Sequence, residues 1–526
     1  MNVISRAVRR TALVIVFGVL LSFAAVGSAA ADTPSSGGDV LVAQTLGDRE
    51  LTFVLRRVTA VPGPLRVDVI THTGSAPGML SVAVTPTGVS SGSSPGVSTA
   101  RGTVVLGATP GSYGTTLPID RAGSWELAVG DGQRTARIPF VVTTQATSPP
   151  DFAVYGGFLG AGVLLIVSVV VAVRARNGRW ALLPAGGVVA GLSVAITGAI
   201  LSASLPLPPQ PGIQLDPTVS NASDPYAVTQ PLIADYSRPP AMLSIAGPAP
   251  VAGRATDLTF ELSDGATGLP VDDLVVHEGA LIHLLIVGPS GQLWHVHPIR
   301  IAPGEFQVRL TLPQTGHYAV SAELERRGGG AQLVRSPSGI DVTAGSATAI
   351  TMPPLSLVSG RAANETVAGT PVSVTATVAP AGSATTIVAT FGSGAVVQPW
   401  LGMLGHLIIA GPLSENATDI GAAVQAAPVW AHAHSMGDLA PSGDMAGMPG
   451  MSGTSAMGSA MSGMGGLMPV NGDSAVDETV AAYGPDISFT FTFPEPGRYR
   501  IWVQAERNFT VLTVPAVVDV SGGARP

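Results

Sequence analysis

Two uncharged apolar runs near the middle of the chain constrain its fold more than any other feature. Residues 152–173 and 180–205 contain no Asp, Glu, Lys or Arg, and each can cross a hydrocarbon core about 30 Å thick. The loop between them, residues 174–179, carries three arginines, which the positive-inside rule places in the cytoplasm. We therefore predict a transmembrane helical hairpin with both flanking regions outside. A buried hairpin in a soluble domain is the alternative, which the length and apolarity of both runs disfavour.

The N-terminus has the pattern of a secretory signal. Three arginines lie within the first ten residues, residues 11–26 are apolar, and small residues at 28–31 precede Asp32. This order predicts a cleaved signal peptide over residues 1–31, with an uncleaved anchor as the alternative. Export of the N-terminus agrees with the outer position that the arginine-rich loop predicts for the flanking regions. We expect a multi-pass protein of the cell membrane, with the lipid bilayer as a partner and both large regions extracytoplasmic.

Composition and charge exclude several classes of function. Hydrophobic residues make up 46% of the 526 residues and charged residues 11%, which fits β-sandwiches combined with membrane segments. The net charge is −8, and the sequence contains no long run of like charge. Nucleic acid is therefore not an expected partner. The chain has no Cys, which excludes disulfides, thiolate metal sites, blue-copper centres and cysteine nucleophiles.

The first outer region, residues 32–147, is predicted to form a β-sandwich. Its short apolar segments are separated by clusters of Gly, Pro and Ser, as in folds built from regular short strands. These segments include residues 51–55, 65–70, 124–129 and 136–142. Its one histidine, His72, is assigned a structural role. Residues 206–240 follow the second apolar run, are rich in Pro, and are expected to form an extended spacer.

The C-terminal region contains the same motifs twice. The distance between matching motifs is much longer than the repeat of a solenoid protein, so it indicates two whole domains. We predict two β-sandwiches, the first repeat at residues 241–345 and the second repeat at 355–522, with a Met-rich insertion at 435–472. The matching segments are LIHLLIVGP (281–289) and LGHLIIAGP (404–412), WHVHP (294–298) and WAHAH (430–434), and LPQTGHY (312–318) and FPEPGRY (493–499).

The pair His277-Glu278, the strand around His283, the WHVHP motif and the two Pro-x-x-Gly-x-Tyr closings together resemble the YtkA-like family of exported β-sandwich domains. The resemblance covers about residues 241–520. It implies a cupredoxin-like or immunoglobulin-like fold at the cell surface, in a family often suspected of binding copper. The expected fold class is therefore mainly β, with tandem immunoglobulin-like or cupredoxin-like sandwiches plus the transmembrane helical hairpin.

In the first repeat, three histidines are predicted to share one face of a hairpin. His295 and His297 are two residues apart, so on a strand they point the same way. The connection GPSGQ suits a three-residue loop with a glycine in the left-handed position. That register sets His283 opposite His297 and Leu285 opposite His295. A two-residue loop would instead separate His283 from the pair.

His277 has the same parity as these three histidines and joins them if its segment is extended. Three or four imidazoles suit Cu(II) or Zn(II). The alternative is a structural histidine cluster that caps the edge of the sandwich.

The second repeat departs from this pattern. Trp400 stands at the position of His277, which leaves His406, His432 and His434, and the long hairpin connection gives no register. The insertion that follows is rich in thioethers, which are soft ligands that select Cu(I). A Met-rich amphipathic helix, which the Gly content disfavours, and low-complexity sequence are the alternatives. The methionines are Met436, Met445, Met448, Met451, Met457, Met461, Met464 and Met468.

We expect metal capture without catalytic turnover, with copper as the ion and zinc possible. The chain shows no nucleophile elbow, phosphate loop or His-Glu-x-x-His motif, and His72 and His317 are assigned structural roles. Copper transport or resistance proteins are the expected protein partners. A surface interaction module with incidental histidines and a zinc-binding or metal-sensing receptor are the alternatives. The candidate ligands are His277, His283, His295, His297, His406, His432, His434, Met436, Met445, Met448 and Met451.

Overall fold

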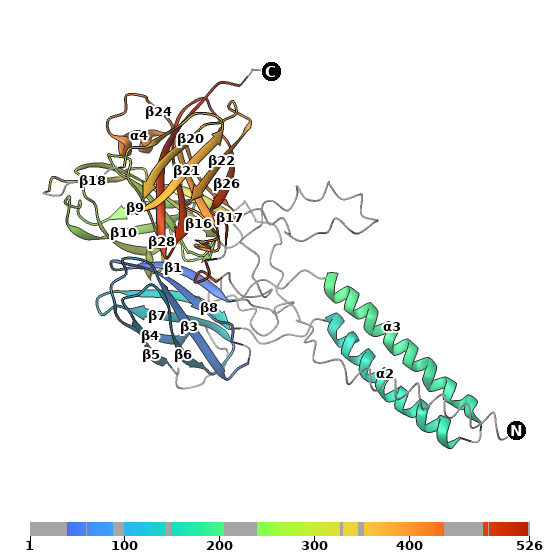
Figure 1. The fold of residues 1–526 in the computed structure, drawn as a ribbon. Helices are drawn as coiled ribbons and strands as arrows, with labels where there is room; N and C mark the ends of the chain where they lie inside the picture. Colours follow the sequence, from blue (N-terminus) through green and yellow to red (C-terminus); the bar gives the residue numbers. More distant parts are fainter. Residues whose placement is uncertain are drawn as a thin grey trace. The chain divides into compact units, whose positions relative to one another are not determined.

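The computed structural model confirms the expected fold class: several antiparallel β-sheets form sandwiches, and one pair of apolar helices forms a hairpin (Figure 1). The predicted signal peptide and most of the Pro-rich spacer lie outside the residues it describes. The structure describes residues 39–58, 60–87, 99–142, 149–175, 177–204, 239–326, 330–345, 352–435, 477–481 and 483–523.

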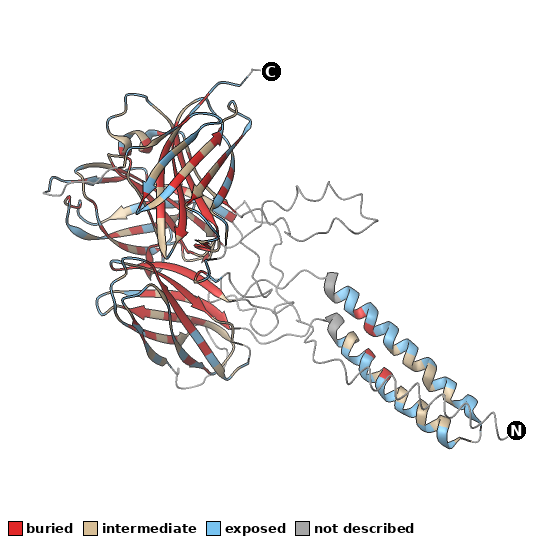
Figure 2. Cartoon of the chain, viewed as in Figure 1, coloured by how far each residue is buried: buried red, intermediate tan, exposed pale blue. Residues whose placement is uncertain are grey.

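The two apolar runs form helices. Helix α2 spans Pro149–Arg174, and a short 3₁₀ turn, η1 (Gly178–Ala181), leads into α3 (Leu182–Ser204). Phe152–Arg174 and Gly178–Leu201 are long and apolar enough to cross a membrane. Only 11% of each stretch is buried, so their side chains lie mostly exposed (Figure 2). Helices in the core of a soluble domain would be mostly buried, so this exposure disfavours the buried-hairpin alternative.

Small residues let α2 and α3 pack closely. A Cβ atom on Gly157 would lie 2.6 Å from the backbone oxygen of Gly191, and one on Gly191 would lie 2.8 Å from that of Gly157. Larger side chains at these positions would push the backbones apart. Close contacts between small residues are typical of helices that associate in lipid.

Residues 40–142 form the N-terminal sandwich, in which the sheet β1-β2-β3-β6 faces the sheet β5-β4-β7-β8. Alternating apolar residues of both sheets fill its core, with Phe53 and Trp125 among the largest fully buried side chains. Its strands are β1 (Val40–Leu46), β2 (Arg49–Leu55), β3 (Gly63–Thr71), β4 (Gly78–Pro86), β5 (Ala100–Leu106), β6 (Gly111–Ile119), β7 (Gly123–Gly130) and β8 (Thr135–Val142).

The first repeat also has two sheets. The order β14-β15-β10-β9 makes one, and β11-β16-β12-β13, with β17 and β18 also paired to β16, makes the other. The strands are β9 (Ala241–Ala246), β10 (Ala255–Asp264), β11 (Leu274–Val275), β12 (His283–Val287), β13 (Leu293–Val296), β14 (Ile299–Ala302), β15 (Glu305–Thr311), β16 (Gly316–Arg326), β17 (Gly330–Arg335) and β18 (Ile340–Val342).

The second repeat has the sheet β20-β21-β22-β26 and the sheet β19-β28-β27-β24-β25, with β23 paired to β27. One short helix, α4 (Ile420–Ala426), lies in the connection from β24 to β25. The strands are β19 (Leu355–Leu357), β20 (Ala362–Val367), β21 (Thr370–Thr377), β22 (Ala384–Phe391), β23 (Val397–Gln398), β24 (Gly405–Leu413), β25 (Val429–Ser435), β26 (Asp486–Thr492), β27 (Gly497–Arg507) and β28 (Thr510–Val520).

The two repeats close alike, as the sequence motifs predict. Tyr318 and Tyr499 each donate a hydrogen bond from the phenol to the backbone oxygen four residues earlier, at 2.9 Å in both cases. This is the tyrosine-corner arrangement found in immunoglobulin-like sandwiches. It anchors β16 and β27 at corresponding positions, so the residues that follow each tyrosine can be compared one by one.

The repeats pack face to face through β12, β16, β24 and β27. Leu285 and Val287 of the first repeat share a buried apolar cluster with Ile408, Ala410 and Trp502 of the second. The N-terminal sandwich contacts the histidine end of this interface, where strand β1 pairs with the segment after β13. Both histidine motifs therefore meet where three sandwiches come together.

Candidate metal centre

The hairpin of the first repeat has the predicted three-residue loop. The amide of Gly288 donates to the backbone oxygen of Gln292 at 2.9 Å, and that of Gly291 donates to Gly288 at 2.8 Å. Gly291 has φ +80°, the left-handed conformation that glycine adopts most readily. Leu285 pairs with His295, which confirms the predicted register.

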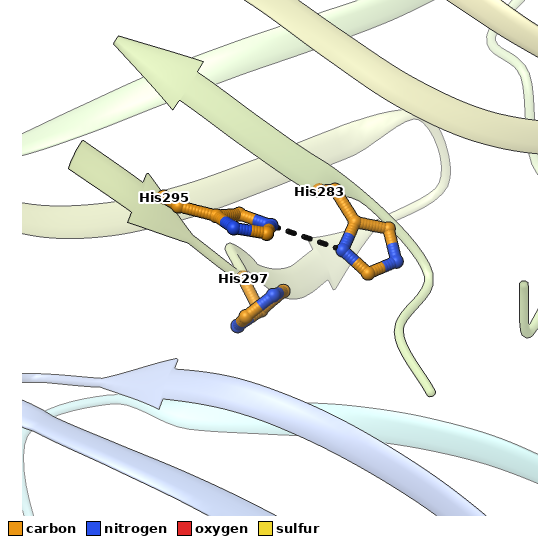
Figure 3. Close-up of side chains that lie close together, drawn as sticks. All are labelled: His283, His295 and His297. Atoms are coloured by element: carbon orange, nitrogen blue, oxygen red, sulfur yellow. Dashed lines mark hydrogen bonds between the residues drawn. The ribbon is translucent and has the colours of Figure 1, made fainter. Parts of the chain in front are cut away.

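His283, His295 and His297, the first triad, project from this hairpin toward one another. His297 lies just beyond the end of β13, and its ring centroid is 5.2 Å from that of His283. One nitrogen from each ring lies within 4.8 Å of the other two (Figure 3). All three side chains are buried. The fold therefore brings three imidazoles together in a buried position.

Each ring of the first triad has an oxygen acceptor on its outer nitrogen. His283 Nε2 donates to the backbone oxygen of His277 at 3.1 Å. His295 Nδ1 donates to Gln504 Oε1 at 2.9 Å, and His297 Nδ1 donates to Glu50 Oε1 at 2.5 Å. Such partners fix the tautomer and orientation of metal-binding histidines. The three acceptors come from all three sandwiches.

These acceptors determine where the lone pairs point. Burial, followed by the charges of neighbouring histidines, lowers the pKa of His283 well below its ordinary value. Burial and the charge of His297 lower the pKa of His295 to about 3. A neutral imidazole has one N–H group. In His283 and in His295 that group donates to the outer acceptor. His283 Nδ1 and His295 Nε2 therefore carry lone pairs, although they face each other at 3.1 Å.

The contact drawn as a dashed line in Figure 3 is a hydrogen bond if one of these nitrogens carries the proton, and in the tautomers above it is a pair of lone pairs placed to bind a cation. A tetrahedral ion with nitrogen ligands at 2.0–2.1 Å separates its ligand atoms by roughly 3.3 Å, close to the 3.1 Å observed. His297 Nε2 is buried and has no hydrogen-bond partner among the described residues. The first triad thus offers two nitrogen lone pairs 3.1 Å apart and a third, unpartnered ring nitrogen, all within 4.8 Å of one another.

The second repeat reproduces this arrangement, in a register that its long connection did not reveal. His406 pairs with His434, and Ile408 pairs with His432. His406 Nε2 donates to the backbone oxygen of Trp400 at 3.3 Å, as His283 does to His277. Trp400 therefore occupies the position of His277, as predicted. His406 Nδ1 faces His432 Nε2 at 3.1 Å, again with both rings buried.

A carboxylate on the neighbouring repeat orients His432. His432 Nδ1 donates to Glu323 of β16, and burial lowers the pKa values of His406 and His432 well below the ordinary value, as do the charges of nearby histidines. Both rings are neutral, so His406 Nδ1 and His432 Nε2 carry lone pairs. With His295 they form a second triad within 4.8 Å. The two triads share His295 and thus form one continuous histidine cluster between the repeats.

His277 does not join the first triad, because the condition on which that prediction depended, an extended segment, is not met. Its segment is a tight turn rather than a strand: Glu278 and Gly279 both have positive φ, and His277 and Ala280 exchange two backbone hydrogen bonds. The turn directs the ring toward carboxylates, with Nδ1 2.9 Å from Glu325. Burial opposes the charged ring, but hydrogen bonds and charges of Glu323, Glu325 and Glu278 raise the pKa of His277 to about 10.

Sequence reasoning missed Glu50, Glu323 and Gln504. Glu50 lies in the N-terminal sandwich, far along the chain from its partner His297, and carries no motif. The other two had a usable signal, because Glu323 and Gln504 each stand five residues after the tyrosine that closes their repeat. A polar residue at the same place in two apolar strands marks a shared role. Met436, Met445, Met448 and Met451, with the rest of the Met-rich insertion, lie outside the described residues.

His72 is buried between the N-terminal sandwich and the second repeat, rather than isolated. Its Nδ1 lies 2.6 Å from Glu506 Oε1, and its Nε2 lies 3.3 Å from Thr52 Oγ1. Burial disfavours the charged ring, but the hydrogen bond and charge of Glu506, with the charges of Glu478 and Glu50, raise the pKa of His72 to about 9. His72 thus forms a buried ion pair that joins two sandwiches.

Replacing His72 with Gln is expected to destabilise the chain more at low pH than at high pH. The pKa rises from 6.5 to about 9 on folding, so the stabilisation is complete below pH 6.5 and is lost as the pH rises through 9. Its size is about 3 kcal/mol, at 1.36 kcal/mol per pKa unit. Urea unfolding of the wild-type and His72→Gln chains across this range measures the difference. A gap that does not change with pH would contradict the ion pair.

Comparisons with known proteins give a partial match to one domain family and no function. The model of a family described as a domain of unknown function (DUF8832) matches residues 241–334 and 473–522. These segments belong to the first repeat and to the end of the second, and they cover less than half of the chain. A search of the curated proteins finds no match.

The solved structures that resemble this chain are β-rich and distant. Latent PorU from Porphyromonas gingivalis shares 8% identity at a TM-score of 0.15, over 93% of this chain and 34% of its own length. The fibronectin(III)-like modules of Clostridium thermocellum CbhA share 11% identity at a TM-score of 0.12, over 53% of this chain and 95% of theirs. Similarities this weak carry no functional argument.

Proposed function

We propose that the protein captures a copper ion at the first triad, without catalytic turnover, in an extracytoplasmic region anchored to the membrane by α2 and α3. The observation that carries the proposal is the convergence of three buried ring nitrogens, from His283, His295 and His297. Each ring has its other nitrogen fixed by an oxygen acceptor. Without a cation this arrangement is electrostatically unfavourable, and with one it matches a built metal site.

The donor set favours copper over other divalent ions. Imidazole sites bind first-row metals in an order that peaks at Cu(II), and zinc is the nearest competitor for three nitrogen ligands. Burial of all three rings supports holding an ion rather than presenting it to a substrate. The methionines that follow His434 in the sequence are soft ligands suited to Cu(I), and we propose that they pass copper to or from the centre and to a transport or resistance protein.

Copper binding by the purified full chain in detergent tests this function. We expect the metal-stripped chain to take up a first, tight equivalent of Cu(II) in equilibrium dialysis, and to prefer Cu(II) to Zn(II). Deletion of residues 436–468 should leave Cu(II) binding intact and reduce Cu(I) binding. A folded chain that binds no copper above background would contradict the proposal and would favour a surface interaction module.

A further inference from the structure

We propose that His277, Glu278, Glu323 and His434 form a second cation site, separate from the first triad, which takes a zinc-class divalent ion. The inference extends the proposed function, on which it rests only in treating the chain as a metal binder. None of its four side chains belongs to the first triad. It therefore predicts a second bound ion with different ligand chemistry.

His277, Glu278 and Glu323 offer donor atoms within 4.8 Å of one another, and His434 adjoins them through Glu278. His434 Nε2 is 2.8 Å from Glu278 Oε2. His277 Nε2 is 3.7 Å from Glu278 Oε2 and 3.7 Å from Glu323 Oε1. A tetrahedral zinc ion separates nitrogen and oxygen ligands by roughly 3.3 Å, and the three observed distances lie on both sides of that value.

The contacts that each side chain already makes indicate which of its atoms would bind the ion. His277 Nδ1 lies 2.9 Å from Glu325, a distance at which its N–H can donate to that carboxylate, so Nε2 is the nitrogen that an ion would bind, by displacing its proton. Glu323 Oε2 accepts from His432, which leaves Oε1. His434 Nε2 and Glu278 Oε2 are both buried and make no hydrogen bond among the described residues, despite their short separation. Two nitrogens and two carboxylates would neutralise the ion and complete its shell.

The backbone holds Glu278 in an unfavourable conformation to place its carboxylate here. Glu278 has φ +49°, in the left-handed region that residues other than Gly seldom adopt. The tight turn from His277 to Ala280 maintains it through two hydrogen bonds of 2.8 and 3.0 Å. Leu401, at the corresponding position of the second repeat, has φ +57°, so the turn belongs to both repeats, and what distinguishes this one is the carboxylate that it fixes in place.

The two repeats differ at the positions that form this site. Only one of the two corresponding sets carries all four ligands, so the interface between the repeats has one such site rather than two. His277, Glu278 and Glu323 correspond to Trp400, Leu401 and Gln504, none of which carries a charge, and His434 corresponds to His297. On that other side, Trp400 and Leu401 pack against Ala43 of the N-terminal sandwich.

The side chains of the second site are more exposed to solvent than those of the first triad. The side chains of His277 and Glu278 are each 20% exposed, and those of Glu323 and His434 are 13% and 11% exposed. These side chains therefore lie nearer to solvent than the rings of His283 and His297. Glu323 also contacts His432, which lies in the histidine cluster, so the second site adjoins the buried centre at its open end.

Zinc stoichiometry of four full-length chains in detergent tests the second site. The wild-type chain is expected to bind two zinc ions at saturation. His277→Gln/Glu278→Gln should bind one, because it removes two ligands of the second site and leaves the first triad. His283→Ala/His297→Ala should also bind one, at the second site. The matched control is His317→Gln/Asp341→Asn, which removes an exposed histidine–carboxylate pair with a 2.8 Å contact and should still bind two.

The outcomes separate this inference from the proposed function. If the wild type binds one ion and His283→Ala/His297→Ala binds none, the second site is wrong and the first triad stands. If His277→Gln/Glu278→Gln binds as many ions as the wild type, the second site is also wrong. If one ion is lost in that variant and none is lost from His283→Ala/His297→Ala, the second site stands and the first triad fails. Circular dichroism of each chain confirms that it is folded.

Discussion

Replacing His283 and His297 together with Ala is expected to abolish tight Cu(II) binding, with a loss of affinity of more than about 100-fold. Changes to the outer partners of metal-binding histidines alone cost 10–100-fold, and this variant removes two of three ligands. His295 remains, still fixed by Gln504, but it is the only ligand of the first triad left, so tight binding that survived in this variant would have to come from the second triad. Competition with a chromogenic chelator measures the affinity of the wild-type and variant chains.

Two further variants make this result specific to the first triad. His406→Ala/His432→Ala removes two ligands of the second triad and should keep a tight Cu(II) ion, because the first triad is intact. His317→Ala, at a half-buried histidine outside the cluster that is paired with Asp341, should bind as the wild type does. If copper were lost from His406→Ala/His432→Ala and retained in His283→Ala/His297→Ala, the ion would belong to the second triad instead.

Removing the bound ion is expected to lower the melting temperature of the chain by roughly 10 °C. A ligand at a thousand times its Kd stabilises the folded state by about 4 kcal/mol, and each kcal/mol shifts the melting temperature of a large domain by about 2–4 °C. The effect should be cooperative across the sandwiches, since the outer partners of the triad come from all three. Thermal unfolding before and after chelation measures it.

The control for this measurement is the same chelation of His283→Ala/His297→Ala. That variant should melt at one temperature with or without chelator, because its tight ion is already absent. An equal shift in both chains would show that the stabilising ion lies elsewhere.

Local sequence signals predicted the fold and one half of the candidate site. The loop between β12 and β13 has a glycine where the backbone needs positive φ, so the register of His283, His295 and His297 followed from turn geometry. The connection from β24 to β25 contains α4, and no turn rule gives a register across such a connection. The pairing of His406 with His434 therefore could not be predicted.

The misplacement of His277 has a different physical cause. Positive φ at two successive residues makes a tight reversing turn, which usually shows itself as Asn-Gly or Asp-Gly. Here the pair is Glu278-Gly279, and in the second repeat it is Leu401-Gly402, both with positive φ. Neither first residue favours that conformation, so the turn depends on tertiary contacts that the local sequence does not record.

The outer partners depend on how whole sandwiches pack. Glu50 reaches His297 because β1 pairs with the segment after β13: the amide of Thr45 donates to the backbone oxygen of His297 at 2.7 Å. Glu323 and Gln504 cross from one repeat to the histidines of the other. Contacts between elements hundreds of residues apart have no local pattern, so the joining of two histidine motifs into one cluster emerges only from the folded structure.

X-ray absorption at the copper edge, on the full chain loaded with one equivalent of Cu(II), tests the central claim most directly. The first triad predicts nitrogen neighbours at about 2.0 Å, with the outer-shell scattering of several imidazole rings, and this signal should vanish in His283→Ala/His297→Ala. A first shell dominated by sulfur, or by oxygen without imidazole scattering, would place the ion outside the histidine cluster and contradict the account.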